Sequence, residues 1–191
     1  MARTADPARR VELVDEIIDR LAESGLASFS LRTLAAALGR STRVLTHHFA
    51  DKEALLLAVL ERLDERQHQA LAATPGWDDP AVGIGSIVAA AWDRHLDPAE
   101  LARTRLVQEI EGLAAAGRLA GHVPAFVAGR ARFVADALVR RGLDPDDALT
   151  RATLLNNAYA GLQADRLTTG DQQRTGAALE MLCALADSWT D

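Results

Sequence analysis

The spacing of apolar residues along the 191-residue chain predicts helices from one end to the other. In residues 7–23, Val11, Val14, Ile17 and Leu21 recur at helical spacing, with charged residues between them. The same period predicts eight further helices, over residues 31–38, 42–47, 51–72, 80–95, 98–116, 124–141, 145–168 and 171–188. No sustained alternation of apolar and polar residues competes with it, so we expect an all-α fold of about nine helices.

Proline and glycine mark the boundaries between these helices. Four of the six prolines follow an aspartate, at Pro7, Pro80, Pro98 and Pro145. Aspartate caps the first turn of a helix, and proline costs nothing at the first helical position, where its missing N–H would be unpaired. We therefore expect helices to begin at these prolines. Residues 74–79, with adjacent proline and glycine, form the strongest break.

Two short helices near the N-terminus are arranged as a helix-turn-helix. Ser30 is a good N-cap for residues 31–38, and Gly39 can take the left-handed conformation that ends a helix. Ser41 can then cap a second helix over residues 42–47. Two helices joined by a short turn with glycine form this DNA-binding motif, whose second helix enters the major groove.

The second helix of this motif carries residues suited to base contacts. Arg43 can donate two hydrogen bonds to guanine, and threonine offers a hydroxyl and a methyl group. The lysine at position 52 is the only one in the chain, and we expect it to contact phosphate. The predicted DNA-binding residues are Arg32, Thr33, Ser41, Thr42, Arg43, Thr46, His47 and Lys52.

The charge of this window supports the prediction. Residues 28–52 contain four cations and one acid, a local charge of +3, whereas the whole chain carries −6. The remaining residues therefore carry −9. Because DNA affinity rests largely on neutralising phosphates, an acidic protein with one basic region fits a DNA-binding role.

The same window resembles the DNA-binding domain of TetR-family transcriptional regulators. The resemblance is carried by Leu34-Ala35, Gly39-x-Ser41, Leu45, His48-Phe49 and Lys52-Glu53-x-Leu55-Leu56, and it covers about the first third of the chain. This chain departs from the family pattern at three positions. The family usually has an apolar residue at the position of Arg40, often a small residue at that of Arg43, and commonly tyrosine at that of Thr46. His47 or Arg43 would then replace the expected tyrosine–phosphate contact.

The predicted domains are residues 1–53, which bind DNA, and residues 54–191, which bind a ligand and dimerise. The helix over residues 51–72 is a shared connector. The last two helices are apolar over much of their circumference, and a second copy of the chain would cover the additional face. A dimer also doubles the base pairs that are read. The resemblance implies pairing through the same two helices.

The resemblance also implies a small-molecule effector. The sequence gives independent support, because polar residues occur within otherwise apolar helices. Converging polar groups in an apolar cavity are typical of ligand sites. The expected ligand-binding residues are Trp92, Gln108, Phe126, Asn156 and Tyr159, around a largely apolar effector. Each also has a structural explanation, Trp92 as a core residue above all.

Several classes of protein are disfavoured by the sequence. It contains no glycine-rich phosphate loop, no nucleophile elbow and no zinc-ligand spacing, so we expect no catalytic residue, no metal and no cofactor. The single cysteine, Cys183, allows no internal disulfide and fits a reducing compartment. No signal peptide or membrane-length apolar stretch is evident, so we expect a cytoplasmic protein.

Two alternatives to a ligand-responsive, homodimeric repressor stay open. One is a DNA-binding regulator without a small-molecule ligand, which acts through a protein partner or as an activator. The other is an all-helical enzyme or carrier that retains the helix-turn-helix as a scaffold. The departures at Arg40 and Thr46 keep this last alternative open.

Overall fold

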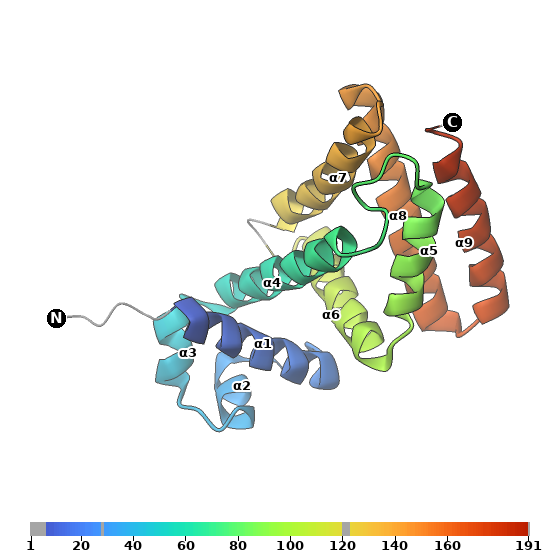
Figure 1. The fold of residues 1–191 in the computed structure, drawn as a ribbon. Helices are drawn as coiled ribbons and strands as arrows, with labels where there is room; N and C mark the ends of the chain where they lie inside the picture. The colour runs from blue at the N-terminus through green and yellow to red at the C-terminus, as the bar shows by residue number, and fades with distance from the viewer. Residues whose placement is uncertain (1–6, 28, 120–122, 191) are drawn as a thin grey trace. The chain divides into compact units, whose positions relative to one another are not determined.

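The structure, a computed structural model, describes residues 7–27, 29–119 and 123–190. In these ranges the backbone forms nine helices and no strand, which confirms the all-α prediction (Figure 1). None of these helices is long and apolar enough to cross a membrane. The helices are α1 (Pro7–Ser24), α2 (Leu31–Ala37), α3 (Thr42–His48), α4 (Lys52–Ala72), α5 (Ile84–His95), α6 (Pro98–Ala115), α7 (Val123–Arg140), α8 (Pro145–Thr169) and α9 (Gln172–Asp187).

The chain divides into two compact units. The first consists of Met1–Glu65 and Ala102–Val123, and the second of Arg66–Leu101 and Pro124–Asp191. The first unit therefore contains α1, α2 and α3 together with most of α4 and α6. The second contains α5, α8, α9 and nearly all of α7.

The first unit is built on the apolar stripe of α1. Ile17 and Ile18 are fully buried, as is Leu45 of α3. The other helices contribute a larger buried set, which comprises Leu34, Ala35, Leu55, Leu56, Val59, Leu60, Leu106 and Ile110. Removing apolar side chains from water at about 25 cal/mol per Å² is the main force that holds such short helices in place, since helices of seven residues are not stable alone.

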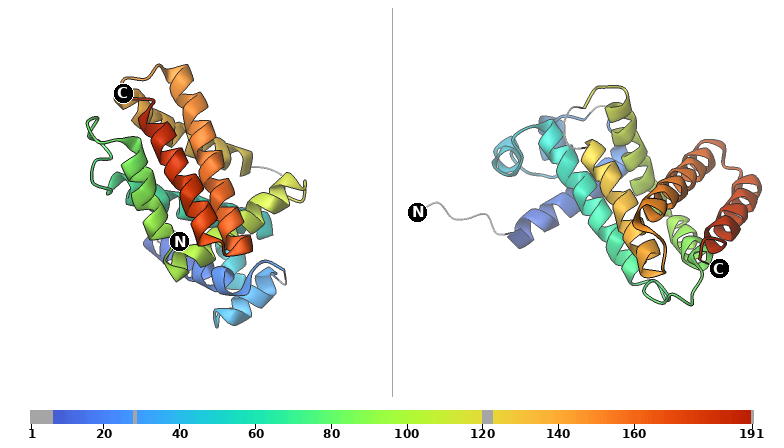
Figure 2. Two further views of the ribbon diagram at one scale, coloured as in Figure 1. Left: turned by 90° about the vertical axis from the view of Figure 1, so that its right-hand side faces the viewer. Right: turned by 90° about the horizontal axis from the view of Figure 1, so that it is seen from above.

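The second unit has its own core, in which α9 packs on both α5 and α8. Trp77, Trp92, Leu138, Leu155 and Leu182 are among its buried members. Figure 2 shows α8 and α9 running side by side as a hairpin.

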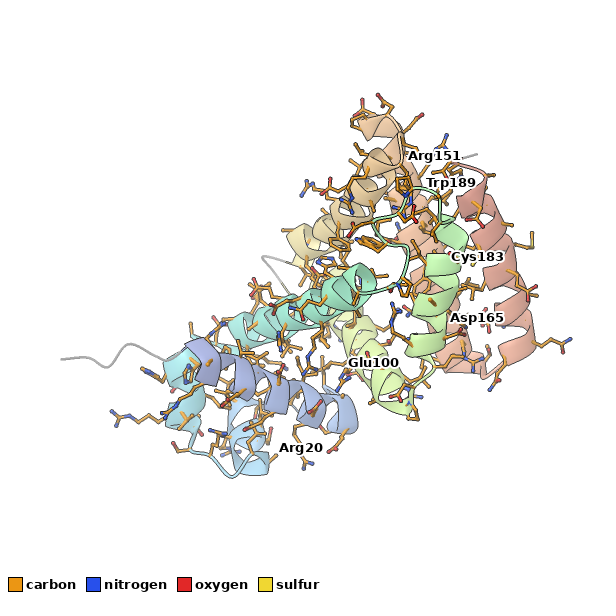
Figure 3. All side chains as sticks on the ribbon, in the orientation of Figure 1. Arg20, Glu100, Arg151, Asp165, Cys183 and Trp189 are labelled. Carbon is orange, nitrogen blue, oxygen red and sulfur yellow. The ribbon has the colours of Figure 1, made fainter. Side chains whose placement is uncertain are left out.

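Polar contacts join both ends of this α8–α9 hairpin. Near the turn, Arg174 donates to both carboxylate oxygens of Asp165, at 2.6 and 2.7 Å. At the other end, the Arg151 guanidinium lies 5.8 Å from the centre of the Trp189 ring and donates to the Trp189 carbonyl (Figure 3). These contacts fix the alignment of the two helices.

The prediction that a helix begins at Pro80 was wrong, because α5 begins at Ile84. The Asp79 carboxylate accepts a hydrogen bond from the Ala81 N–H at 2.9 Å, and the Asp79 carbonyl accepts one from the Val82 N–H at 3.1 Å. These bonds close a turn instead of starting a helix. Asp144 does cap a helix as predicted, since its side chain accepts hydrogen bonds from the two backbone N–H groups that follow Pro145.

Candidate functional site

The turn between α2 and α3 has the backbone geometry predicted for a helix-turn-helix. Gly39 has a φ of +63°. Its N–H donates to the Ala36 carbonyl at 3.1 Å, and the Arg40 N–H donates to the Ala35 carbonyl at 2.9 Å. This is the Schellman pattern, which satisfies two helix-end carbonyls and turns the chain sharply. It sets the angle at which α3 leaves α2.

The serine caps of the two helices differ. Ser30 and Thr33 form a reciprocal capping box, in which each side chain accepts from the other residue's backbone N–H. Ser41 occupies the N-cap position of α3, as predicted, but its side chain makes no cap hydrogen bond. The exposed Ser41 hydroxyl is therefore available to another partner, whereas Thr33 stabilises the start of α2.

One face of α3 is polar and exposed. Thr42, Arg43, Thr46 and His47 all lie on it, while Leu45 between them is completely buried. The spacing of four residues places these side chains on one side of the helix. Four of the predicted DNA-binding residues are thus brought together on a single surface.

The neighbouring His48 is partly buried behind this surface. Burial first, and the charges of His47, Arg10 and Arg40 next, lower the pKa of His48 below its usual value. The imidazole is therefore neutral near pH 7. Of the two adjacent histidines, His47 is the one on the exposed face.

The four cations of the basic window have different surroundings. Arg40 donates to both carboxylate oxygens of Glu16 on α1, at 2.8 and 2.7 Å, so its guanidinium is already paired with a carboxylate. Lys52 donates to the Phe29 carbonyl at 3.2 Å, and its Nζ lies 4.7 Å from the centre of the Phe29 ring. Within the part of the chain that the structure describes, Arg32 and Arg43 form no ion pair. These two are the cations free to meet an anionic partner.

The second unit contains a small pocket among three helices. Its lining comprises Gln67, His68 and Leu71 of α4, Arg130, Phe133 and Val134 of α7, and Asn156, Tyr159, Ala160 and Gln163 of α8. The space open to the centre of a water molecule is about 50 Å³. At 10–15 Å³ for each water, the pocket holds about four water molecules.

Aromatic rings form one wall of this pocket. The Phe133 ring is stacked on His68, at 3.7 Å between ring centres, and on Trp77, at 5.1 Å. Tyr159 makes an edge-to-face contact with Trp92 at 5.5 Å. Burial raises the pKa of the Tyr159 hydroxyl far above its usual value, so this phenol stays protonated.

The pocket contains two of the five residues predicted to bind a ligand, Asn156 and Tyr159. Trp92 is 5% exposed and belongs to the core of the second unit. Phe126 is buried under the Arg130 guanidinium, 4.9 Å from its ring centre, and does not line this pocket. Gln108 belongs to the first unit.

The sequence did not predict three residues of this lining, Arg130, His68 and Phe133. Two periodic patterns could have identified the lining. Asn156, Tyr159 and Gln163 follow one face of α8, and Arg130 shares a face of α7 with Phe133 and Val134. A charged residue that shares a helix face with apolar residues, at a spacing of three or four, indicates that the side chain lines a pocket.

Comparison with known proteins agrees with the geometry of the helix-turn-helix. Residues 13–59, which comprise most of α1, both short helices and the start of α4, match the family "Bacterial regulatory proteins, tetR family". The helix-turn-helix region of the chain is thus of the TetR type.

Curated TetR-family relatives match the chain over part of its length. The HTH-type transcriptional regulator BetI of Stenotrophomonas maltophilia is 29% identical over 90 residues, which cover 46% of each chain. BetI of Burkholderia lata is 31% identical over 90 residues, 44% of this chain and 45% of that protein. The chain thus spans about half the length of the curated relatives it matches.

Solved structures match nearly the whole chain. The multidrug binding protein EbrR complexed with ethidium is 28% identical, with a TM-score of 0.73, and the match covers 93% of this chain and 98% of EbrR. A TetR-family regulator from Rhodococcus is 20% identical, with a TM-score of 0.76 over 96% and 98% of the two chains, and shows the common fold.

Proposed function

We propose that the protein is a homodimeric transcriptional repressor that binds a pseudo-palindromic DNA operator and is released by a small effector. The observation that carries this proposal is the exposed polar face of α3, with Arg43 unpaired at its N-terminal end. The TetR-family match and the regulator BetI support it. Residues 1–53 would bind DNA, and residues 54–191 would bind the effector and dimerise.

In this proposal α3 enters the major groove of DNA. Arg43 reads guanine through two donors, and Thr42, Thr46 and His47 contact neighbouring bases or phosphates. Arg32, Thr33, Ser41 and Lys52 contact the sugar–phosphate backbone. Lys52 keeps donors for this role, because an ammonium has three N–H groups and the Phe29 carbonyl takes one.

The dimer would form through α8 and α9. These helices expose large apolar side chains, with Met181 at 76%, Leu154 at 52% and Leu185 at 44% exposed. Met181 and Leu185 are four residues apart and therefore share one face of α9. A contiguous apolar patch built from such side chains would mark an interaction site. A second copy of the same surface would cover it and place two α3 helices on one operator.

The effector would bind in the pocket between α4, α7 and α8. Apolar and aromatic walls with a few polar groups are typical of small-molecule sites. EbrR, a structural neighbour, has been solved with imidazole and with ethidium. The helix α4 contributes to both compact units, and a ligand that shifts it would act on the DNA-binding part.

An unbiased selection of duplex DNA fragments bound by the purified protein tests this function. We expect enrichment of a two-fold symmetric sequence whose half-sites are separated by about one helical turn or a multiple of it. Enrichment of an unsymmetrical sequence would contradict the dimer, and no enrichment at low salt would contradict DNA binding.

A further inference from the structure

The N-terminal end of α3 has little of its own to hold it in place. Thr42 and Arg43 are exposed, and Leu45 is the first completely buried side chain along this helix. The N-cap residue Ser41 makes no side-chain hydrogen bond that would close the first turn. A helix of seven residues is not stable alone, so contacts with neighbouring helices must fix its position. The end of α3 that carries Arg43 therefore depends on the residues just before it.

Arg40 joins this end of α3 to α1. Its Nη2 donates to Glu16 Oε1 at 2.8 Å and to Glu16 Oε2 at 2.7 Å, and its backbone N–H donates to the Ala35 carbonyl at 2.9 Å. Among residues 39–44, all of which the structure describes, Arg40 is the one whose side chain forms an ion pair with another helix. Glu16 precedes Ile17 and Ile18, which are fully buried, so the pair ties the turn to a firmly packed part of α1.

The C-terminal end of α3 is held differently, by apolar packing. Leu45 is completely buried, and Phe49, the residue that follows the helix, is 2% exposed. The Arg10 guanidinium of α1 lies 5.4 Å from the centre of the Phe49 ring. These contacts do not involve Arg40. Loss of the Arg40–Glu16 pair would therefore release the N-terminal end of α3, while its C-terminal end stayed packed on the first unit.

We propose that Glu16 is a positioning residue for base recognition, which acts through Arg40 to hold the N-terminal end of α3 at the angle that Arg43 needs to meet base edges. The inference rests on the proposed function, in which α3 enters the major groove. A guanine contact with two donors requires both to be aligned at once, whereas attraction to phosphate tolerates a tilt of the helix. Glu16 is an acid that phosphates repel, so any favourable effect on DNA binding must come through Arg40.

The opposite charges of the pair make a test possible. Glu16→Gln removes a negative charge and Arg40→Gln a positive one, so simple attraction to phosphate predicts opposite changes in affinity. A positioning role predicts a weaker preference for the operator in both variants. Fluorescence anisotropy with the selected operator and with an unrelated duplex, at one salt concentration, gives two Kd values for each protein. Their ratio measures operator preference and cancels the effect of net charge that is common to both duplexes.

We expect each substitution to reduce operator preference by about three- to fivefold. The side chains of Arg40 and Glu16 are 39% and 46% exposed, and ion pairs of this kind contribute modestly. The double variant Glu16→Gln/Arg40→Gln should lose no more than either single variant, because the same interaction is removed in all three. Glu12→Gln is the matched control, since Glu12 is an exposed glutamate four residues earlier on α1 and forms no ion pair in the described part of the chain. It loses the same charge and should keep the wild-type preference.

Two results would overturn this inference alone, in a wild-type protein that binds its operator. One is unchanged operator preference in both single variants. The other is tighter operator binding by Glu16→Gln with a salt slope steeper by about 1, because Arg40 would then be a phosphate contact that Glu16 restrains. A wild-type protein that binds no duplex would instead contradict the proposed function, and the inference with it.

Discussion

The Glu109 carboxylate of α6 accepts a hydrogen bond from the Leu26 backbone N–H at 2.7 Å, across 83 residues of sequence. Leu26 follows Gly25, which ends α1 with a φ of +68°. The Leu26 N–H, which follows the end of α1, therefore finds its acceptor on Glu109 of α6 and not in a neighbouring residue. Both partners belong to the first unit, so α6 stabilises the connection that leads from α1 to the helix-turn-helix.

Glu109→Gln should therefore destabilise the protein. Glutamine keeps a carbonyl oxygen that can accept the Leu26 N–H, so the substitution removes the charge of the acceptor and not the whole bond, and we expect a loss of about 0.5–1 kcal/mol in the free energy of unfolding. Urea unfolding measures the change. Glu61→Gln, an exposed glutamate of α4 in the same unit, is the matched control and should change stability by less than about 0.5 kcal/mol. Equal effects of the two substitutions would refute the capping role.

Gly85→Ala should destabilise the packing of α5 on α9. An added Cβ would lie 2.7 Å from the Cys183 carbonyl oxygen and 2.5 Å from Asp187 Oδ2, and the Gly85 N–H already donates to Asp187 Oδ1 at 2.6 Å. We expect a loss of about 1–3 kcal/mol in the free energy of unfolding.

Gly112→Ala provides the contrast for this prediction. Gly112 lies within α6 and nothing lies within 4 Å of its added Cβ, so the change should stabilise the protein by about 0.5–1 kcal/mol. If both substitutions changed the free energy of unfolding in the same direction, the close contact at Gly85 would not determine the effect of an added Cβ.

Acidification should destabilise the protein through His95. Burial first, and the charge of Arg166 second, lower the pKa of His95 from 6.5 to about 4 in the folded state. Between these values the unfolded chain binds a proton that the folded protein does not, so the free energy of unfolding falls as pH decreases from about 6.5 to 4. The total is about 3 kcal/mol, and no such effect is expected above pH 7.

His95→Gln isolates this contribution. Denaturant titrations at pH 7 and pH 4.5 should show that wild type loses about 2–3 kcal/mol more than the variant. A variant with the same loss as wild type would show that His95 is not the buried titrating group.

Met181→Lys should weaken the proposed dimer. A lysine at this exposed position of α9 would put like charges on both copies within an apolar interface, so we expect at least a ~100-fold rise in the dimer dissociation constant. Sedimentation velocity measures the change. Val139→Lys on α7, where the wild-type side chain is 39% exposed, is the control and should leave the dimer intact. A Met181→Lys protein that stays dimeric would place the interface elsewhere.

Local rules explain how closely the sequence predicted the helices. Gly39 and the cap at Ser30 involve only residues within one turn, so propensity and capping decided them. The Asp79-Pro80 pair also predicted the start of a helix, and this prediction was wrong, because the hydrogen bonds of Asp79 close a turn before Gly83. An Asp-Pro dipeptide can therefore begin a helix or form a turn.

Long-range contacts explain what the sequence did not predict. Nothing in the residues around Glu109 indicates a hydrogen bond to Leu26, and nothing near Arg40 indicates its pairing with Glu16. The local charge of +3 also overestimates the free positive charge for this reason. Of the pocket lining, the sequence predicted only Asn156 and Tyr159 of α8. Arg130 and His68 resemble solvated residues when the sequence of each helix is considered by itself.

Salt-dependent binding to the selected operator tests whether α3 reads duplex DNA. Fluorescence anisotropy of wild type, Arg43→Ala, Lys52→Ala and the control Arg140→Ala gives affinity and salt slope together. We predict binding that weakens steeply with salt, a loss of about 1–3 kcal/mol with relaxed base preference for Arg43→Ala, and a uniform loss with a slope reduced by about 1 for Lys52→Ala. Wild-type binding that does not change with salt, or an Arg43→Ala protein with unaltered affinity and base preference, would contradict DNA reading by α3.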